Sequence, residues 1–109
     1  MKAIVKLLLA VCALCSAAMC AAADPKAALP RVEQVCQACH GMDGNSQIAD
    51  NPKLGGQYPD YLAKALRDYQ SGLRKNPIMA GFVDKLSNQD IENLAAYYAS
   101  QPAVVVTKH

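Results

Sequence analysis

Two pairs of cysteines in this chain share one spacing, with two residues between the partners. The first pair is Cys12 and Cys15, and the second is Cys36 and Cys39. Only the second pair is followed directly by a histidine, His40. Two thiols one helical turn apart, with an imidazole next in sequence, form the CxxCH motif that attaches c-type haem. The sequence therefore predicts thioether bonds from Cys36 and Cys39 to one porphyrin edge, and iron ligation by His40.

Three other uses of the second pair explain the residues less completely. A thioredoxin-type dithiol has the same gap but needs a strand–helix setting, which the surrounding pattern does not offer. A zinc site needs four ligands, and beyond these three residues only His109 is a candidate outside the first 23 residues. A plain disulfide between Cys36 and Cys39 leaves the role of His40 unexplained. Haem attachment accounts for all three residues.

A second axial ligand for the iron must come from elsewhere in the chain. The candidates are Met42, Met79, His109 and several lysines. Met42 is too close to His40 to reach the other face of the ring easily, and His109 is the last residue. Met79 follows Pro77 in an irregular stretch, with enough chain to pass round the porphyrin edge. We therefore predict His40 and Met79 as the axial pair, which favours electron transfer because no iron position is left open.

The first 23 residues have the pattern of a secretory leader. Lys2 and Lys6 precede an apolar stretch at 7–14, and an A-x-A cleavage site lies at 21–23. We expect residues 1–23 to be a signal peptide, residues 24–109 the mature domain, and the location periplasmic. The alternative is an uncleaved anchor, because residues 7–23 carry no charge. Without the two leader lysines, basic and acidic residues balance, which argues against a nucleic-acid partner.

The remaining pattern is helical. Apolar periodicity and turn residues predict helices at 30–39 and 59–71, a short helical turn at 82–86, and a last helix capped by Ser87 that ends before Pro102. Between them lie two long irregular stretches, 41–57 and 72–81. Residues 104–106 favour β structure but have nothing to pair with. The predicted fold class is all-α, with the two stretches surrounding a group that completes a small core.

At this point the sequence resembles the bacterial class I cytochromes c. The resemblance rests on "CQACHG", "NPKLGGQYPDYL", "GLRKNPIMAGFVDKLS" and "DIENLAAYYASQ", which occur in the family's order. It implies the cytochrome c fold, with three to four helices wrapped around one covalently bound haem c. It also implies that Pro52 supplies the carbonyl that accepts the Nδ1–H of His40. The first and last helices of the family cross, which would bring Ala28 and Val32 against Leu94 and Tyr97.

The haem propionates need hydrogen-bond donors if they are buried. Tyr61, Arg74 and Asn76 are the candidates, and each has an equally simple reading as a solvated surface residue. A single CxxCH indicates one haem.

We expect a one-electron carrier in a respiratory chain, without enzymatic activity, that passes electrons between redox proteins and an oxidase or reductase through weak, transient contacts. Four lysines offer a local docking patch: Lys53, Lys64, Lys75 and Lys85. Contact with a membrane is expected only through an uncleaved leader. Two alternatives remain, namely the haem electron-entry subunit of a larger dehydrogenase complex, and a haem enzyme or gas sensor in which the Met79 bond opens.

Overall fold

The computed structural model describes residues 22–104, and the regular structure of this part is helical throughout. The predicted leader, apart from its last two residues, and residues 105–109 lie outside the described range. The predicted all-α class is confirmed. The elements, in chain order, are η1 (Pro25–Ala28), α2 (Leu29–Arg31), η2 (Val32–Cys36), α3 (Gln37–His40), α4 (Pro59–Ser71), α5 (Pro77–Val83) and α6 (Asn88–Ala99).

The first four elements form one continuous helical stretch that begins earlier than predicted. Asp24 is the N-cap, and its carboxylate accepts the N–H of Lys26 at 3.0 Å. Pro25 follows at the first helical position, where a missing N–H has no cost. The predicted start, Pro30, lies inside the helix. One turn, η2, is wound as a π-helix, and the stretch ends at Gly41 with φ of +81°.

The prediction for α4 agrees with the structure, whereas that for α5 was wrong. Helix α4 begins at Pro59 and ends before Gly72, whose φ of +84° closes the helix in the left-handed region. Helix α5 spans Pro77–Val83, so it occupies much of the stretch expected to be irregular and ends where the short helical turn was expected. The missed signal is Asn76, which precedes Pro77 and caps the helix with its side chain.

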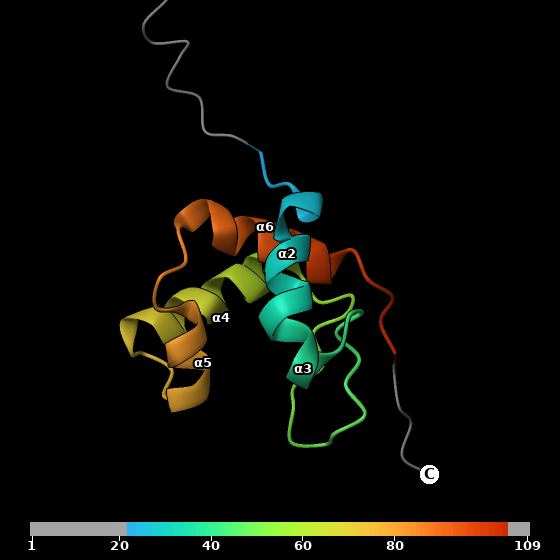
Figure 1. Ribbon diagram of the computed structural model, residues 1–109, viewed down its shortest axis with the longest axis horizontal. Helices are drawn as coiled ribbons and strands as arrows, with labels where there is room; N and C mark the ends of the chain where they lie inside the picture. The colour runs from blue at the N-terminus through green and yellow to red at the C-terminus, as the bar shows by residue number, and fades with distance from the viewer. Residues whose placement is uncertain (1–21, 105–109) are drawn as a thin grey trace, which may run out of the picture.

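Helix α6 is the centre of the packing. Helix α6 contacts η1 and α4. The N-terminal helical stretch crosses α6 through η1, the first element of that stretch (Figure 1). The capping box predicted from Ser87 is present, with Asp90 as its partner. The residues expected at the helix crossing are all buried in one core cluster: Ala28, Val32, Leu94 and Tyr97. Val32 and Ile91 are fully buried, both with 0% of their surface exposed.

Residues 41–58 form a long loop along the α3 side of the domain (Figure 1). Leu54 donates its N–H to the carbonyl of Gly44 at 2.7 Å, which closes the loop on itself. Asn45 is buried there and donates to the carbonyl of Pro102 at 2.8 Å. Within residues 22–104, no helix is both long enough and apolar enough to cross a membrane.

Candidate haem site

A cavity of about 340 Å³ lies between the N-terminal helical stretch, α4, α5, α6 and the long loop. Small-molecule sites typically enclose ~300–1,000 Å³. All eight site residues predicted from the sequence line this cavity: Cys36, Cys39, His40, Pro52, Tyr61, Arg74, Asn76 and Met79. Four residues of one face of α4 line it as well: Leu62, Ala65, Leu66 and Tyr69. The structure thus brings together residues from four separate segments of the chain.

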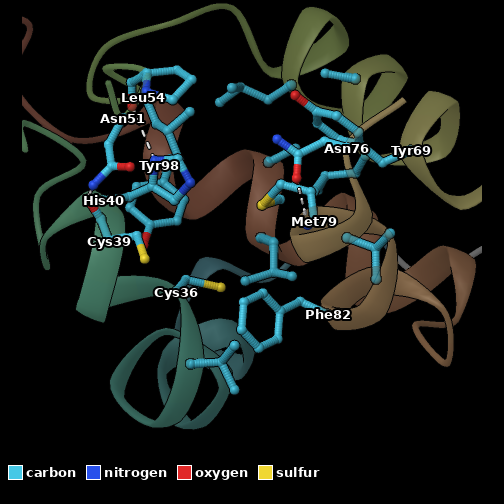
Figure 2. Close-up of a pocket in the computed structure, with 18 of the residues that line it drawn as sticks. Cys36, Cys39, His40, Asn51, Leu54, Tyr69, Asn76, Met79, Phe82 and Tyr98 are labelled. Carbon is cyan, nitrogen blue, oxygen red and sulfur yellow. Dashed lines mark hydrogen bonds between the residues drawn. The ribbon is translucent and has the colours of Figure 1, made fainter. Parts of the chain in front are cut away.

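The two cysteines lie one turn apart on η2 and α3, and both are free thiols (Figure 2). Cys36 is half-buried and Cys39 is exposed. Burial raises the pKa of the Cys36 thiol above its usual range, and the positive charge of Arg31 opposes that rise. The two thiols therefore share one edge of the cavity but differ in how far they are exposed to solvent.

His40 is buried at the end of α3, and its ring has one nitrogen engaged. The Nδ1 atom lies 3.0 Å from the carbonyl oxygen of Pro52. Because a carbonyl only accepts, Nδ1 must carry the proton, and Nε2 is left with its lone pair free. A second contact joins the loop to the same helix end, where Asn51 Nδ2 donates to the carbonyl of Cys39 at 2.8 Å. The loop thus fixes both the tautomer and the orientation of the imidazole.

Met79 lies in the first turn of α5, on the side of the cavity opposite His40 (Figure 2). Its side chain is half-buried, and its sulfur points into the cavity toward the side that His40 occupies. The alternative ligand Met42 does not line the cavity and is 40% exposed. The other alternative, His109, lies outside the described residues. Of the two methionine candidates, only Met79 presents its sulfur to the space in front of His40.

The three propionate candidates line the cavity but differ in their exposure and in the contacts that their polar groups already make. Arg74 places its guanidinium 5.0 Å from the centre of the Tyr69 ring, a cation–π distance. Tyr61 is 52% exposed at the mouth of the cavity. Asn76 already uses its Oδ1 as the cap of α5, accepting from Ile78 and Met79, so only its Nδ2 remains available as a donor.

Sequence reasoning missed several cavity residues. Leu54 and Tyr98 line it, and their signal was only apolar character within a loop and a helix. Phe82 lies at its rim and is 47% exposed. Arg31 lines the cavity as well. Their positions depend on how distant segments pack, so no local pattern could have indicated them.

The donor set of the cavity fits a covalently attached haem. Two thiols lie at one edge, an imidazole with a free Nε2 lies on one side, and a thioether faces it from the other. Leucines supply much of the remaining wall: Leu54, Leu62, Leu66, Leu86 and Leu94. Within residues 22–104, no three His, Cys, Asp or Glu side chains converge as ligands for a bare metal ion. The site therefore suits an apolar macrocycle with its own metal better than zinc.

This fold and donor set define a class I c-type cytochrome. Residues 23–97 match the family described as "Cytochrome C oxidase, cbb3-type, subunit III". The chain belongs to that family of cytochrome c domains, and membership implies covalently bound haem c.

Individual relatives agree with this assignment. The chain is 44% identical over 79 residues to cytochrome c4 of Thiocapsa roseopersicina, covering 72% of this chain and 41% of that protein. It is 45% identical over 94 residues to cytochrome c4 of Stutzerimonas stutzeri, covering 78% of this chain and 44% of that protein. A third relative, 40% identical over 80 residues, is the thiosulfate dehydrogenase electron acceptor of Thiomonas intermedia, with 72% of this chain and 34% of that protein covered. The chain thus spans less than half the length of each.

The solved structure of cytochrome c4 from Acidithiobacillus ferrooxidans has the same fold. It matches with a TM-score of 0.67 and 25% sequence identity, covering 76% of this chain and 52% of that one.

Proposed function

We propose that this chain carries one haem c, bound to Cys36 and Cys39 and ligated by His40 and Met79, and that it serves as a one-electron carrier. The observation that carries the proposal is the arrangement of the two axial candidates. His40 Nδ1 is engaged by the Pro52 carbonyl at 3.0 Å, and the Met79 sulfur faces the same space from the opposite wall. Haem c, when bound, supplies a one-electron Fe(III)/Fe(II) couple.

The protein's own groups would raise or lower the reduction potential of that couple. The Pro52 carbonyl holds the Nδ1 proton of His40 and so raises the basicity of Nε2, which favours the oxidised state. The thioether of Met79 is a weaker donor and raises the reduction potential. The apolar wall of the cavity limits access of water and favours the state of lower charge. If His40 and Met79 ligate the iron of a bound haem, no iron position would be left open, and the site would suit electron transfer rather than catalysis on a bound substrate.

Charges near the cavity suggest the kind of surface a redox partner presents. Arg31, Lys53 and Arg74 line the cavity, whereas Asp50 is the single acidic residue that does so. A bound haem would add two negative propionates, for which Arg74 is a candidate partner, so Arg31 and Lys53 are the cations left to favour docking of an acidic surface through transient contacts. Of the four lysines expected to form a patch, only Lys53 lines the cavity. Lys64 instead forms an ion pair with Asp68 on α4.

The name of the Thiomonas intermedia relative suits a carrier that receives electrons from a dehydrogenase. We infer a dehydrogenase or a quinol-oxidising complex as donor, and an oxidase or reductase as acceptor. Exported location follows from the leader pattern of residues 1–23. Mass spectrometry of protein purified from the periplasmic fraction tests this: we expect a mature chain that begins at Asp24 and carries the mass of one haem.

The haem assignment is tested by substitution of cysteines, with a matched control. Cys39→Ala and Cys36→Ala should each lower the haem that resists acid–acetone extraction. Cys15→Ala, in the first CxxC pair, should leave that haem unchanged, because Cys15 lies in the leader. For the axial ligands, Met79→Ala should abolish the weak long-wavelength absorption band of sulfur-ligated Fe(III). Undiminished haem in Cys39→Ala, or a wild type that lacks the sulfur band and binds CO rapidly, would refute the proposal.

A further inference from the structure

Tyr98 on α6 bonds to both ends of the long loop that carries Pro52. Its hydroxyl donates to the carbonyl of Gly41, directly after His40, at 3.2 Å. Its own backbone carbonyl accepts the N–H of Gly56 at 3.1 Å. Pro52 lies between these two attachment points. One residue of α6 therefore fixes where the loop leaves His40 and where it returns after Pro52.

The ring of Tyr98 also packs directly on the loop backbone. The ring lies so close to Gly44, whose φ is +74°, that position 44 has no room for a side chain. A Cβ at this position would lie 2.8 Å from Tyr98 Cδ1 and 2.6 Å from the backbone nitrogen of Gly55. Tyr98 is buried with 4% of its surface exposed, and it lines the cavity. Burial raises its pKa well above the ordinary value, so the hydroxyl remains a proton donor across the neutral range.

The neighbouring Tyr97 offers a natural comparison. Its hydroxyl donates to the carbonyl of Met42 at 2.7 Å, and its ring meets that of Tyr98 edge-on with centroids 5.1 Å apart. It is buried to a similar degree, but it does not line the cavity. Its backbone carbonyl accepts from Ser100 and Gln101 instead of from the loop. Tyr97 thus holds the loop only near its start.

We propose that Tyr98 is a positioning residue, which sets the separation of His40 Nδ1 and the Pro52 carbonyl and thereby the donor strength of His40. This inference rests on the proposed function, in which His40 ligates the haem iron. When the loop loses its hydrogen bond to the Tyr98 hydroxyl, the hydrogen bond from His40 Nδ1–H to the Pro52 carbonyl lengthens. His40 Nε2 then becomes less basic. A less basic imidazole stabilises Fe(III) less, so the midpoint potential rises.

The test compares Tyr98→Phe with Tyr97→Phe in the haem-loaded protein. Each variant keeps its ring and loses one hydroxyl bond to the loop. For Tyr98→Phe we expect solvent exchange of the His40 Nδ1 proton, followed by NMR, to accelerate about fivefold, the effect of one hydrogen bond. We also expect the oxidised-to-reduced ratio at a fixed potential to change about threefold. Because a tenfold change in this ratio corresponds to 59 mV for a one-electron couple, the midpoint potential should rise by about 28 mV.

For Tyr97→Phe we expect a comparable loss of thermal stability with a wild-type potential and exchange rate. A Tyr98→Phe protein with wild-type potential and wild-type exchange overturns the proposal. Equal shifts in both variants also overturn it, because they would assign the effect to general loosening of α6. A wild type that holds no covalent haem would refute the haem assignment itself, and the role of Tyr98 with it.

Discussion

Asn76 has two interpretations that a pair of substitutions separates. In the structure its Oδ1 accepts the N–H groups of Ile78 at 3.0 Å and Met79 at 3.1 Å, which makes it the N-cap of the helix that carries Met79. From the sequence it was a candidate donor to a haem propionate, a role that would use its Nδ2. Asn76→Ala removes both functions. Asn76→Asp keeps the accepting oxygen and removes the donor.

The size of the cap effect follows from the geometry. Replacement of an asparagine N-cap by alanine costs ~0.5–2 kcal/mol, typically ~1 kcal/mol. Asn76 is exposed, so water replaces part of what is lost, and a value of about 1 kcal/mol is the reasonable expectation. If that energy is lost only while α5 is closed on the haem, the open state with Met79 displaced becomes about fivefold more populated.

The assay is binding of imidazole to the ferric protein, because imidazole competes with Met79 for the iron. The apparent dissociation constant should fall about fivefold in Asn76→Ala, in proportion to the population of the open state. Asn76→Asp should bind imidazole as the wild type does, and Met79→Ala, which has no competing ligand, should bind most tightly. If Asn76→Asp behaves like Asn76→Ala, the donor role prevails over the cap. If neither variant differs from the wild type, α5 does not control access to the iron.

Three further predictions concern thiols, acid stability and the core. In the haem-free protein, iodoacetamide should alkylate Cys39 faster than Cys36, because Cys39 is exposed whereas Cys36 is half-buried and burial raises the pKa of its thiol; equal rates would contradict this. Hydrogen bonds from the backbone and side chain of Ser87 lower the pKa of Asp90 in the folded state. The contribution of Asp90 to stability is therefore present above the pKa that Asp90 has in the unfolded chain, and it is lost as pH falls through the pKa of the folded state. Asp90→Asn should therefore lower the urea midpoint at pH 7 but not at pH 2, and a loss that does not depend on pH would exclude the linkage. Ile91→Ala should cost ~2–5 kcal/mol in urea unfolding, since the side chain is fully buried, and a loss under 1 kcal/mol would show that the site collapses around the gap.

Local signals in the sequence were sufficient for some elements and insufficient for others. Pro59 and Gly72 bound α4 as expected, because both act through their own backbone conformation. The start of the first helix was misplaced, since Asp24 before Pro25 is as strong a cap signal as Pro30 within an apolar pattern. Helix α5 was missed because Asn76 and Pro77 also suit an irregular stretch. That choice depends on packing against α4.

The site shows the same division between local and long-range information. Cys36, Cys39 and His40 are neighbours in sequence, so one local motif is enough to predict a shared chemistry for them. Met79 is predicted as the second ligand by elimination of the other candidates, and the structure places its sulfur in the same cavity. Tyr98 could not be found in this way, because its role depends on contacts with a loop 57 residues earlier in the chain. On α6 it looked like one more apolar position on a buried face.

The elements that carry His40 and Met79 differ in how extensively they pack against the rest of the domain. This difference affects how the site works. The helical stretch that carries His40 packs through η1 against α6, and the loop behind His40 is bonded to α6 as well. Helix α5, which carries Met79, packs mainly against α4, and near its C-terminal end its anchor is Gln70, which donates to the carbonyls of Val83 at 2.9 Å and Leu86 at 2.8 Å. Local opening takes place where buried contacts are few, so the Met79 side should open long before the His40 side. A carrier requires that this opening be rare, whereas a gas sensor requires that it be frequent. The strength of the Asn76 cap and of the Gln70 bonds therefore decides between these two uses of one cavity, and the imidazole titration measures it directly.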